Sequence, residues 1–311
     1  MENALSFVSV NEEARLQYEK GSTYADARRK LYEFAIDKRD LWSEMAKRLE
    51  IKQGDLIVDA GTGNGAFPEL LDKRVSHDFR GQFDGLIVGL DKYPQNFAET
   101  RTRIGATSID TRTLFIDGDV ENLIFPPKSV DTFSLNFLLY HVDDPIKVLD
   151  SAKDALVEGG QLLVSTRGTR NQQRLWHYGD LIADRLGSTR PESFYSQFDI
   201  ATCREELGKL FHIEEEAKPQ AGHLAIPLDL DKPNDNRGWS IYRDAILGLV
   251  LMMRNKNTGL PVDEAQALAI IDGEIREEFT REAKNMRAFT SSSAYFMEQV
   301  DQTYFVCRNS K

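Results

Sequence analysis

The stretch that most constrains the fold of this chain is Leu56–Phe67, with the sequence LIVDAGTGNGAF. It begins with three apolar residues, which suit a buried strand of a parallel sheet, and then carries the acid Asp59. Three glycines follow at alternate positions: Gly61, Gly63 and Gly65. Because glycine has no Cβ, the backbone can turn tightly here and approach a ligand closely. A helical pattern begins at Ala66, so the loop opens onto a helix N-terminus, which favours an electronegative part of a nucleotide-like cofactor.

Strand and helix patterns alternate through the first half of the chain, which predicts an open and mostly parallel α/β sheet. One helix is expected over 24–49, before the first strand. Another is expected over 145–156, because a proline begins it and the pair Gly159–Gly160 ends it. The strands expected after the glycine loop are 85–91, 113–116, 130–136 and 161–165.

The second half of the chain has a less regular pattern. Helices are expected over 171–186, 202–211, 239–254 and 262–286. A strand is expected over 211–215, and the end of the chain, 295–307, has the pattern of extended structure. Residues 227–238 are rich in turn-forming residues and indicate a connector between these elements.

The composition narrows the classes of function. The formal net charge of −11 argues against a protein that binds nucleic acid, which usually has a basic surface. The two cysteines, Cys203 and Cys307, have no metal-ligand spacing and are expected as free thiols in a reducing compartment. No apolar run reaches the roughly 18–20 residues of a membrane span. The first 20 residues lack the pattern of a secretory signal, so we expect a cytoplasmic protein.

Three acids end three successive strands: Asp59, Asp91 and Asp119. In open α/β sheets, ligands bind beyond the carboxyl ends of the strands, where the acid after the second strand can accept hydrogen bonds from both ribose hydroxyls. A dinucleotide loop usually reads G-x-G-x-x-G, whereas this loop reads G-x-G-x-G with an acid two residues before it. An acid there is poorly suited to a pyrophosphate and suits a cofactor with an α-amino group and a sulfonium.

The chain resembles the class I S-adenosylmethionine-dependent methyltransferases over about residues 50–166. The motifs that carry the resemblance are DAGTGNG (59–65), the acid after GLIVGL (85–91), GDVENLIF (118–125), VDTFSLNFLLYHVDD (130–144) and LVEGGQLLV (156–164). The most similar subgroup acts on small molecules and includes quinone-biosynthesis and natural-product methyltransferases. The polar insert 76–84, which lengthens the path from the loop to Asp91, departs from the family pattern.

The resemblance implies a Rossmann-like fold with a seven-stranded, mostly parallel sheet, an antiparallel last strand and helices on both faces. It also implies N-terminal lid helices and a helical cap inserted between strands 6 and 7. The domains expected on this basis are a lid over 1–49, an α/β core over 50–226, a cap insertion over 227–290 and a final core strand over 291–311.

The resemblance further implies a role for each residue of the cofactor site. The glycines Gly61, Gly63 and Gly65 would pack against the methionine portion of S-adenosylmethionine, beside Asp59. Asp91 would hold the ribose, with Lys92 next to it, and Asp119 with the Val120 backbone would bind the adenine. Asn136 would lie near the methionine amino group or the transferring methyl, and Tyr24 would close over the cofactor. For the acids, a structural role in a turn or helix cap is the alternative.

Two histidines are candidates for the chemistry. His141 follows the fourth strand and has the side chain of a general base, and His177 lies in the helix after the fifth strand, where the family often builds its acceptor pocket. Packing at the sheet edge and an exposed helical position are the structural alternatives. Arg167 and Arg170 follow the fifth strand and are candidates to meet an acidic acceptor. No metal is expected, because the acids Asp143–Asp144 precede a proline and resemble a helix cap.

The sequence therefore predicts a methyltransferase that acts on a small, partly apolar metabolite, in keeping with secondary metabolism, as a monomer or homodimer. Proximity and orientation would supply much of the rate. The alternatives are a protein or RNA methyltransferase and an S-adenosylmethionine-binding protein that does not methylate, either regulatory or cyclase-like. A nicotinamide dehydrogenase is a more distant alternative. Whether the acceptor atom is oxygen, nitrogen or carbon stays open.

Overall fold

The computed structural model of the chain describes residues 23–93, 113–122, 125–189, 198–220, 222–229, 236–285 and 293–310, with positions 95, 98, 101, 102 and 104. The chain divides into two compact units. We call one the sheet unit, which comprises 39–168, 194–219 and 302–311. The other is the helical unit, which comprises 1–38, 169–193 and 220–301.

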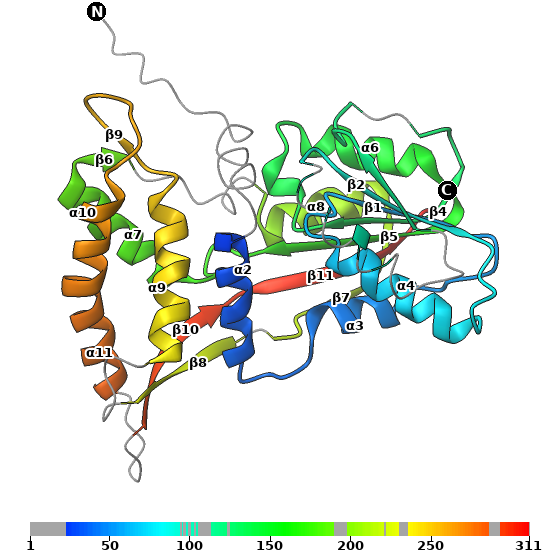
Figure 1. Cartoon of the computed structure of the whole chain (residues 1–311). Helices are drawn as coiled ribbons and strands as arrows, with labels where there is room; N and C mark the ends of the chain where they lie inside the picture. The colour runs from blue at the N-terminus through cyan, green and yellow to red at the C-terminus, as the bar shows by residue number, and fades with distance from the viewer. Residues whose placement is uncertain are drawn as a thin grey trace, which may run out of the picture. The chain divides into compact units, whose positions relative to one another are not determined.

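The sheet unit contains a seven-stranded sheet in the order β3-β2-β1-β4-β5-β11-β7 (Figure 1). Its strands are β1 Leu56–Ala60, β2 Leu86–Asp91, β3 Thr113–Asp117, β4 Val130–Asn136, β5 Leu156–Arg167, β7 His212–Ala217 and β11 Gln302–Arg308. Strands β1 to β5 pair in parallel, whereas β11 pairs antiparallel with both β5 and β7. The predicted mostly parallel seven-stranded sheet with an antiparallel last strand is therefore confirmed.

Helices cover both faces of this sheet, as predicted. Helices α3 (Leu41–Lys47) and α4 (Ala66–Asp78) pack on one face, and α6 (Pro145–Ala155) and α8 (Ile200–Leu210) pack on the other (Figure 1). The core on the α3 and α4 side consists of side chains that are almost fully buried, among them Leu41, Met45, Ile57, Leu71, Val75, Ile87 and Tyr304. Burial of this apolar surface is the main favourable contribution to the stability of the unit.

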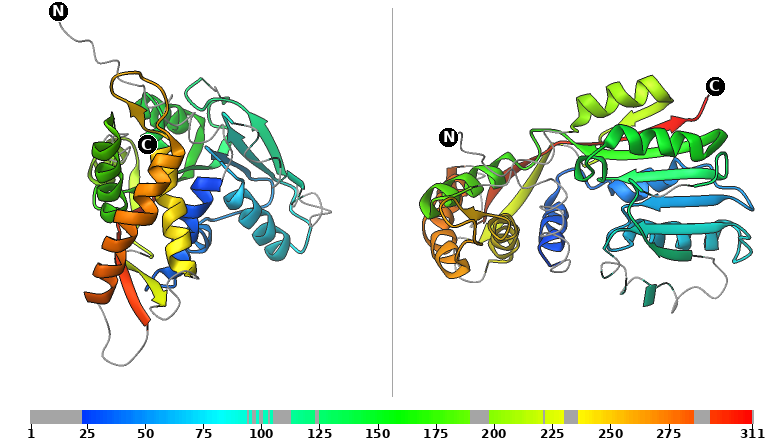
Figure 2. Two further views of the ribbon diagram at one scale, coloured as in Figure 1. Left: turned by 60° about the vertical axis from the view of Figure 1, so that its left-hand side comes forward. Right: turned by 90° about the horizontal axis from the view of Figure 1, so that it is seen from above.

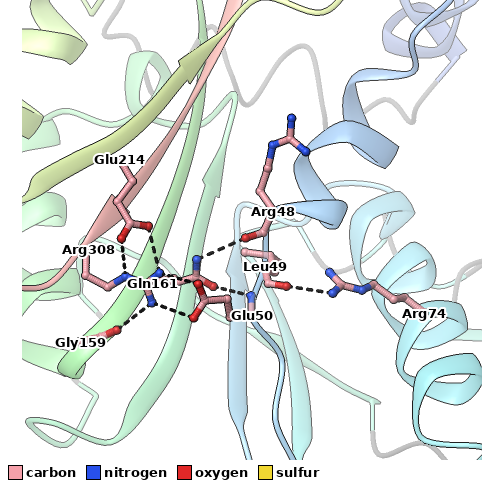
Figure 3. A network of polar contacts seen from close by, with 8 residues as sticks. All are labelled: Arg48, Leu49, Glu50, Arg74, Gly159, Gln161, Glu214 and Arg308. Atoms are coloured by element: carbon pink, nitrogen blue, oxygen red, sulfur yellow. Dashed lines mark hydrogen bonds and ion pairs between the residues drawn. The ribbon is translucent and has the colours of Figure 1, made fainter.

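A polar network stabilises the end of the sheet where α3 leads into β1 (Figure 3). The Gln161 side chain accepts a hydrogen bond from the amide of Glu50 at 2.7 Å and donates to the carbonyl of Arg48 at 3.3 Å. On the neighbouring strand, Arg308 donates to Glu214 at 2.9 Å and to Glu50 at 3.0 Å. Three strands are thereby joined to the segment after α3, which fixes the start of the glycine-loop strand.

The helical unit contains a two-stranded antiparallel ribbon with helices packed against it. The ribbon pairs β8 (Gly222–Asp229) with β10 (Ser293–Val300). Figure 2 shows the long helices of this unit alongside the ribbon, in green, yellow and orange. Its helices are α2 Thr23–Lys30, α7 Gln173–Leu186, α9 Arg237–Val250, α10 Glu264–Ile270 and α11 Arg276–Asn285. A π-helical turn, Ile271–Ile275, joins α10 to α11, and a short ribbon pairs β6 (Ser188–Thr189) with β9 (Arg254–Asn255).

Buried aromatic rings form the centre of the helical unit. The rings of Phe279 and Phe296 stack with their centroids 4.2 Å apart, and Tyr242 lies 5.1 Å from each of them. Tyr178 meets Tyr242 edge-on at 6.2 Å. Aromatic rings of this kind bury large apolar areas, so this cluster gives the helical unit a core of its own.

The structure corrects the single helix that was expected over 24–49. Helix α2 and a 3₁₀ turn, Leu31–Phe34, are followed by Ala35 in an extended conformation, which forms a β-bridge with Leu224. A new helix, α3, starts after Asp40, whose side chain accepts a hydrogen bond from the amide of Ser43 at 2.8 Å. The continuous apolar spacing did not show this break, because a distant strand pairs with Ala35 and a local cap restarts the helix.

The last part of the chain also differs from expectation. Residues 293–308 form two strands, and only β11 joins the seven-stranded sheet, whereas β10 pairs with β8. Part of the predicted connector, 227–229, belongs to β8. Consequently the two units do not follow the predicted domain boundaries: residues 169–193 and 220–226, expected in the core, belong to the helical unit, and the predicted final segment divides after Asp301.

Among the described residues, no helix is long and apolar enough to cross a membrane. In the same part of the chain, no three His, Cys, Asp or Glu side chains gather as a metal-ligand set. The two thiols, Cys203 and Cys307, are buried and not joined in a disulfide.

Candidate functional site

The glycine loop forms the first part of the site. Gly61 has φ +71° and Gly65 has φ +72°, a left-handed conformation that residues with a Cβ adopt at a cost. The amides of Gly61 and Thr62 both donate to the carbonyl of Leu90, at 2.8 and 3.0 Å, which holds the loop against the end of β2. A Cβ on Gly61 would lie 2.7 Å from the Leu138 side chain. The backbone conformation therefore favours glycine here, and any larger residue at Gly61 would also require the Leu138 side chain to shift.

Asp59 lies at the end of β1 with its carboxylate buried in a polar network. One oxygen accepts hydrogen bonds from the Ser134 hydroxyl at 2.5 Å and from the side-chain nitrogen of Asn136 at 3.1 Å, and the other accepts from the Thr62 hydroxyl at 2.8 Å. Burial raises the pKa of Asp59 to about 6, and the three hydrogen bonds oppose that rise because they favour the charged form. The carboxylate thus joins the glycine loop to strand β4.

Asn136 ends β4, and both ends of its side-chain amide have partners. The nitrogen donates to Asp59, and the oxygen accepts from the Ser165 hydroxyl at 3.3 Å. The next residue, Phe137, has φ +53°, and its amide donates to the carbonyl of Ser165. The Arg167 guanidinium lies 4.6 Å over the Phe137 ring. In this structure Asn136 fixes Asp59 from inside the sheet.

Asp91 ends β2 and contacts the glycine loop directly. Its carboxylate accepts hydrogen bonds from the amide of Gly63 at 2.6 Å and from the amide of Tyr93 at 2.8 Å. Burial raises the pKa of Asp91, although both amides favour its charged form. A carboxylate can accept about four hydrogen bonds. The two amides use part of that capacity, so the residue fits a ligand with a pair of hydroxyl donors.

Asp119 follows β3 in an acidic turn. Its carboxylate forms an ion pair with Lys92 at 2.8 Å and accepts a hydrogen bond from the amide of Glu121 at 3.1 Å. The hydrogen bond to Asp119 raises the pKa of Lys92. The amide of Gly118 donates to the carbonyl of Asp91 at 3.0 Å, so this turn lies against the end of β2. Val120 is half-buried between these polar groups.

His141 lies in a 3₁₀ turn, Leu139–His141, shortly after β4. Its ring is half-buried and its centroid lies 4.5 Å from that of Tyr140. Two residues later, the amides of Asp143 and Asp144 both donate to one oxygen of the Glu121 carboxylate. Asp144 caps α6 by accepting from the amide of Lys147 at 3.0 Å, as the sequence predicted.

His177 has a different environment from His141. It lies on α7 of the helical unit, with its side chain half exposed and its Nε2 3.9 Å from Glu278. On the same helix, Arg174 pairs with Glu282 at 2.5 Å and Arg185 pairs with Glu274 at 2.9 Å. His177 thus lies between two ion pairs that join α7 to the segment 274–282.

The sheet unit therefore brings together most of the predicted site residues, beyond the carboxyl ends of β1 to β4. These are Asp59, Gly61, Gly63, Gly65, Asp91, Lys92, Asp119, Val120, Asn136 and His141. Tyr24 and His177 belong to the helical unit. Tyr24 lies in α2, and its side chain is outside the described residues. The residues that sequence reasoning missed are Thr62, Ser134, Ser165 and Glu121, which hold the predicted ones in place.

Comparisons with known proteins identify the family of the chain. A family model described as a methyltransferase domain matches residues 28–213. A curated relative, the ubiquinone/menaquinone biosynthesis C-methyltransferase UbiE of Methylococcus capsulatus, is 30% identical over 125 residues, which cover 40% of this chain. The match spans 48% of that relative, about half of its length.

Solved structures resemble the chain at low sequence identity. A putative methyltransferase from Bacillus halodurans is 13% identical, with 87% of this chain and 99% of that chain covered and a TM-score of 0.47. The phosphoethanolamine N-methyltransferase 2 of Haemonchus contortus is 14% identical, with 98% and 61% covered and a TM-score of 0.47. At these values neither likeness decides anything about function.

Since the family model matches more than half of the chain, the chain belongs to the methyltransferase-domain family. This family, together with the seven-stranded mostly parallel sheet, agrees with the class I methyltransferase fold that the motifs predicted.

Proposed function

We propose that the chain transfers the methyl group of S-adenosylmethionine to a small, partly apolar metabolite. The observation that carries this proposal is the contact between Asp91 and the glycine loop. The carboxylate holds the Gly63 amide at 2.6 Å and keeps acceptor capacity for a ribose. A buried acid with that capacity, beside a loop of left-handed glycines, fits a nucleoside at the end of β2.

Other residues of the sheet unit each bind a different part of the cofactor. Asp119 and the Val120 backbone bind the adenine, and Lys92 balances the charge of Asp119 through their ion pair. The glycines lie against the methionine portion, where no Cβ blocks its approach. Asp59 supplies a buried negative charge beside that loop, which complements the cationic amino group and sulfonium.

When bound, the cofactor would supply a methyl group on a sulfonium, and the acceptor would bond to that methyl in line as the carbon–sulfur bond breaks and S-adenosylhomocysteine leaves. The chain orients the acceptor against that methyl and excludes water, and proximity supplies much of the rate. His141 removes a proton where the acceptor must lose one. The turn that carries His141 follows β4, the strand that ends at Asn136 next to Asp59. His177, by contrast, lies among ion pairs of the helical unit.

The acceptor class rests on the sequence resemblance and on the curated relative. That relative is named for C-methylation in ubiquinone and menaquinone biosynthesis, and it supports an aromatic, partly apolar acceptor as the first class to test. We propose that the partner is a small molecule and not a nucleic acid, because the chain carries a net charge of −11. We also propose a cytoplasmic site of action.

Calorimetry with S-adenosylmethionine and with its product S-adenosylhomocysteine tests the cofactor site. We expect both to bind at micromolar or lower concentrations, and failure of both would refute the proposal. Methyl transfer is then measured with radiolabelled cofactor and a panel of phenols, quinols, amines and carboxylic acids. Tight cofactor binding without transfer to any member would favour the non-methylating alternative, and transfer to bulk protein or RNA would favour a macromolecular substrate.

A further inference from the structure

The carboxylate of Glu121 makes a contact that none of the roles above uses. Glu121 lies in the turn after β3, and one of its oxygens accepts hydrogen bonds from two successive amides, those of Asp143 at 3.0 Å and Asp144 at 2.9 Å. The donors follow it by 22 and 23 residues, with the whole of β4 between. A single side chain therefore joins the turn before β4 to the loop after β4.

The backbone of Glu121 belongs to the turn that we assign to the adenine. Its amide donates to the Asp119 carboxylate at 3.1 Å, and the other Asp119 oxygen pairs with Lys92. The position of the Glu121 backbone is thus set by the acid that would bind the base. A ligand at Asp119 would restrain Glu121 as well, through a contact one hydrogen bond away.

At its other end, the Glu121 contact holds the loop that carries His141. Asp143 is two residues after the 3₁₀ turn, and Asp144 caps α6. The His141 amide donates to the carbonyl of Leu138 at 2.7 Å, which fixes the start of the loop. The two amides on Glu121 fix its end. Leu139, Tyr140 and Val142 are buried, whereas Asp143 and Asp144 are exposed. Hydrogen bonds to a charged group are about twice as strong as neutral ones, so this attachment restrains the exposed end of the loop.

We propose that Glu121 is a positioning residue that couples the adenine turn to the loop of His141. Cofactor binding at Asp119 then also orders residues 139–144, the segment that meets the acceptor. This inference rests on the proposed cofactor site, but the attachment of the loop to Glu121 can be tested without any ligand.

Hydrogen exchange of the full chain tests the attachment directly, with peptides that cover 118–122 and 139–147. In Glu121→Ala we expect the amides of 143–144 to exchange about tenfold faster than in the wild type, the lower end of the change that loss of one hydrogen bond to a charged group produces. Glu121→Gln keeps an acceptor oxygen without the charge and should restore most of the protection. Glu205→Ala is the matched control, because Glu205 is 69% exposed and pairs only with Lys209 among the described residues.

The coupling is tested by adding S-adenosylhomocysteine. In the wild type it should slow exchange in both peptides, and in Glu121→Ala only in 118–122. Equal slowing of both peptides in Glu121→Ala would overturn the coupling, and unchanged exchange at 143–144 without ligand would overturn the attachment. Faster exchange throughout the sheet unit would show a global loss of stability and refute a local role. Absence of any ligand effect in the wild type would refute the cofactor site, and the ligand-free comparison would still decide the attachment.

Discussion

The carboxylate of Asp91 and the amide of Gly63 are 2.6 Å apart, although 28 residues separate them in the chain. The contact joins the end of β2 to the middle of the glycine loop. Two further bonds, from the amides of Gly61 and Thr62 to the Leu90 carbonyl, hold the loop in the same place. The loop is therefore already fixed on the sheet before a ligand arrives, which lowers the cost of ordering it on binding.

Replacement of Asp91 by alanine should weaken cofactor binding by at least about 100-fold. The change removes the acceptor for the ribose hydroxyls and also frees the Gly63 amide, and each hydrogen bond to a charged group contributes about 1.5–3 kcal/mol. Calorimetry with S-adenosylhomocysteine measures the loss. Asp150→Ala, at an exposed position on α6, removes the same charge and should bind normally. Near-normal affinity of Asp91→Ala would contradict the ribose assignment.

Replacement of Ser134 by alanine should raise the pKa of Asp59 above its value of about 6 in the wild type. The hydroxyl lies 2.5 Å from the carboxylate and favours its charged form, so its loss favours the protonated form. Carbon NMR of labelled aspartate measures the titration. Ser129→Ala, whose hydroxyl bonds only to the carbonyl of Pro126 among the described contacts, is the control. A pKa that stays the same or falls would show that Ser134 does not stabilise the charge.

The two histidines should respond differently to replacement. With an acceptor that must lose a proton, His141→Ala should lower kcat by about 100-fold, the typical contribution of a general base, with cofactor affinity unchanged. His177→Ala should keep kcat within about twofold, because its half-exposed ring lies 3.9 Å from Glu278 in a row of ion pairs. Steady-state kinetics of both variants checks this. The reverse order of effects would move the catalytic role to His177.

Much of the sheet unit could be predicted because its signals are local. The first two parallel strands, β1 and β2, are short apolar runs, the glycine loop needs positive φ, and Pro145 marks the start of α6. The helical unit was harder to predict because its boundaries depend on distant pairing. Ala35 leaves the helical conformation to bridge Leu224, and the chain after Asp301 changes from one ribbon to another sheet. No local pattern encodes either choice.

The same distinction applies to the site. Asp59, Asp91 and Asp119 could be placed at one edge of the sheet because each lies at or just after a strand end that the sequence shows. Their partners could not, because Ser134 reaches Asp59 across 75 residues and depends on the pairing of β1 with β4. The register of that pairing places Ser134 directly opposite Asp59. Ser134 and Asn136 are two residues apart, so they lie on the same face of β4. That spacing was the sequence signal that could have indicated both as partners of Asp59.

Glu298 should make the stability of the helical unit depend on pH. The side chain is fully buried and accepts hydrogen bonds from Tyr242 at 2.6 Å and from the amide of Leu175, in the first turn of α7, at 3.0 Å. Burial raises its pKa from 4.5 to about 7, and the hydrogen bonds oppose that rise. Between pH 4.5 and about 7, Glu298 binds a proton more often in the folded chain than in the unfolded chain. The free energy of unfolding therefore falls as pH rises through this range.

Glu298→Gln isolates this contribution, because glutamine keeps an oxygen for the amides and does not titrate. The shift corresponds to about 3 kcal/mol between pH 4.5 and 7, so the loss of stability from pH 4.5 to pH 8 should be smaller in the variant by about that amount. Urea unfolding at both pH values measures the difference. Glu277→Gln, at an exposed position on α11, should follow the wild type. If Glu298→Gln shows the same pH dependence as the wild type, the buried carboxylate does not titrate in this range and remains charged in the folded protein.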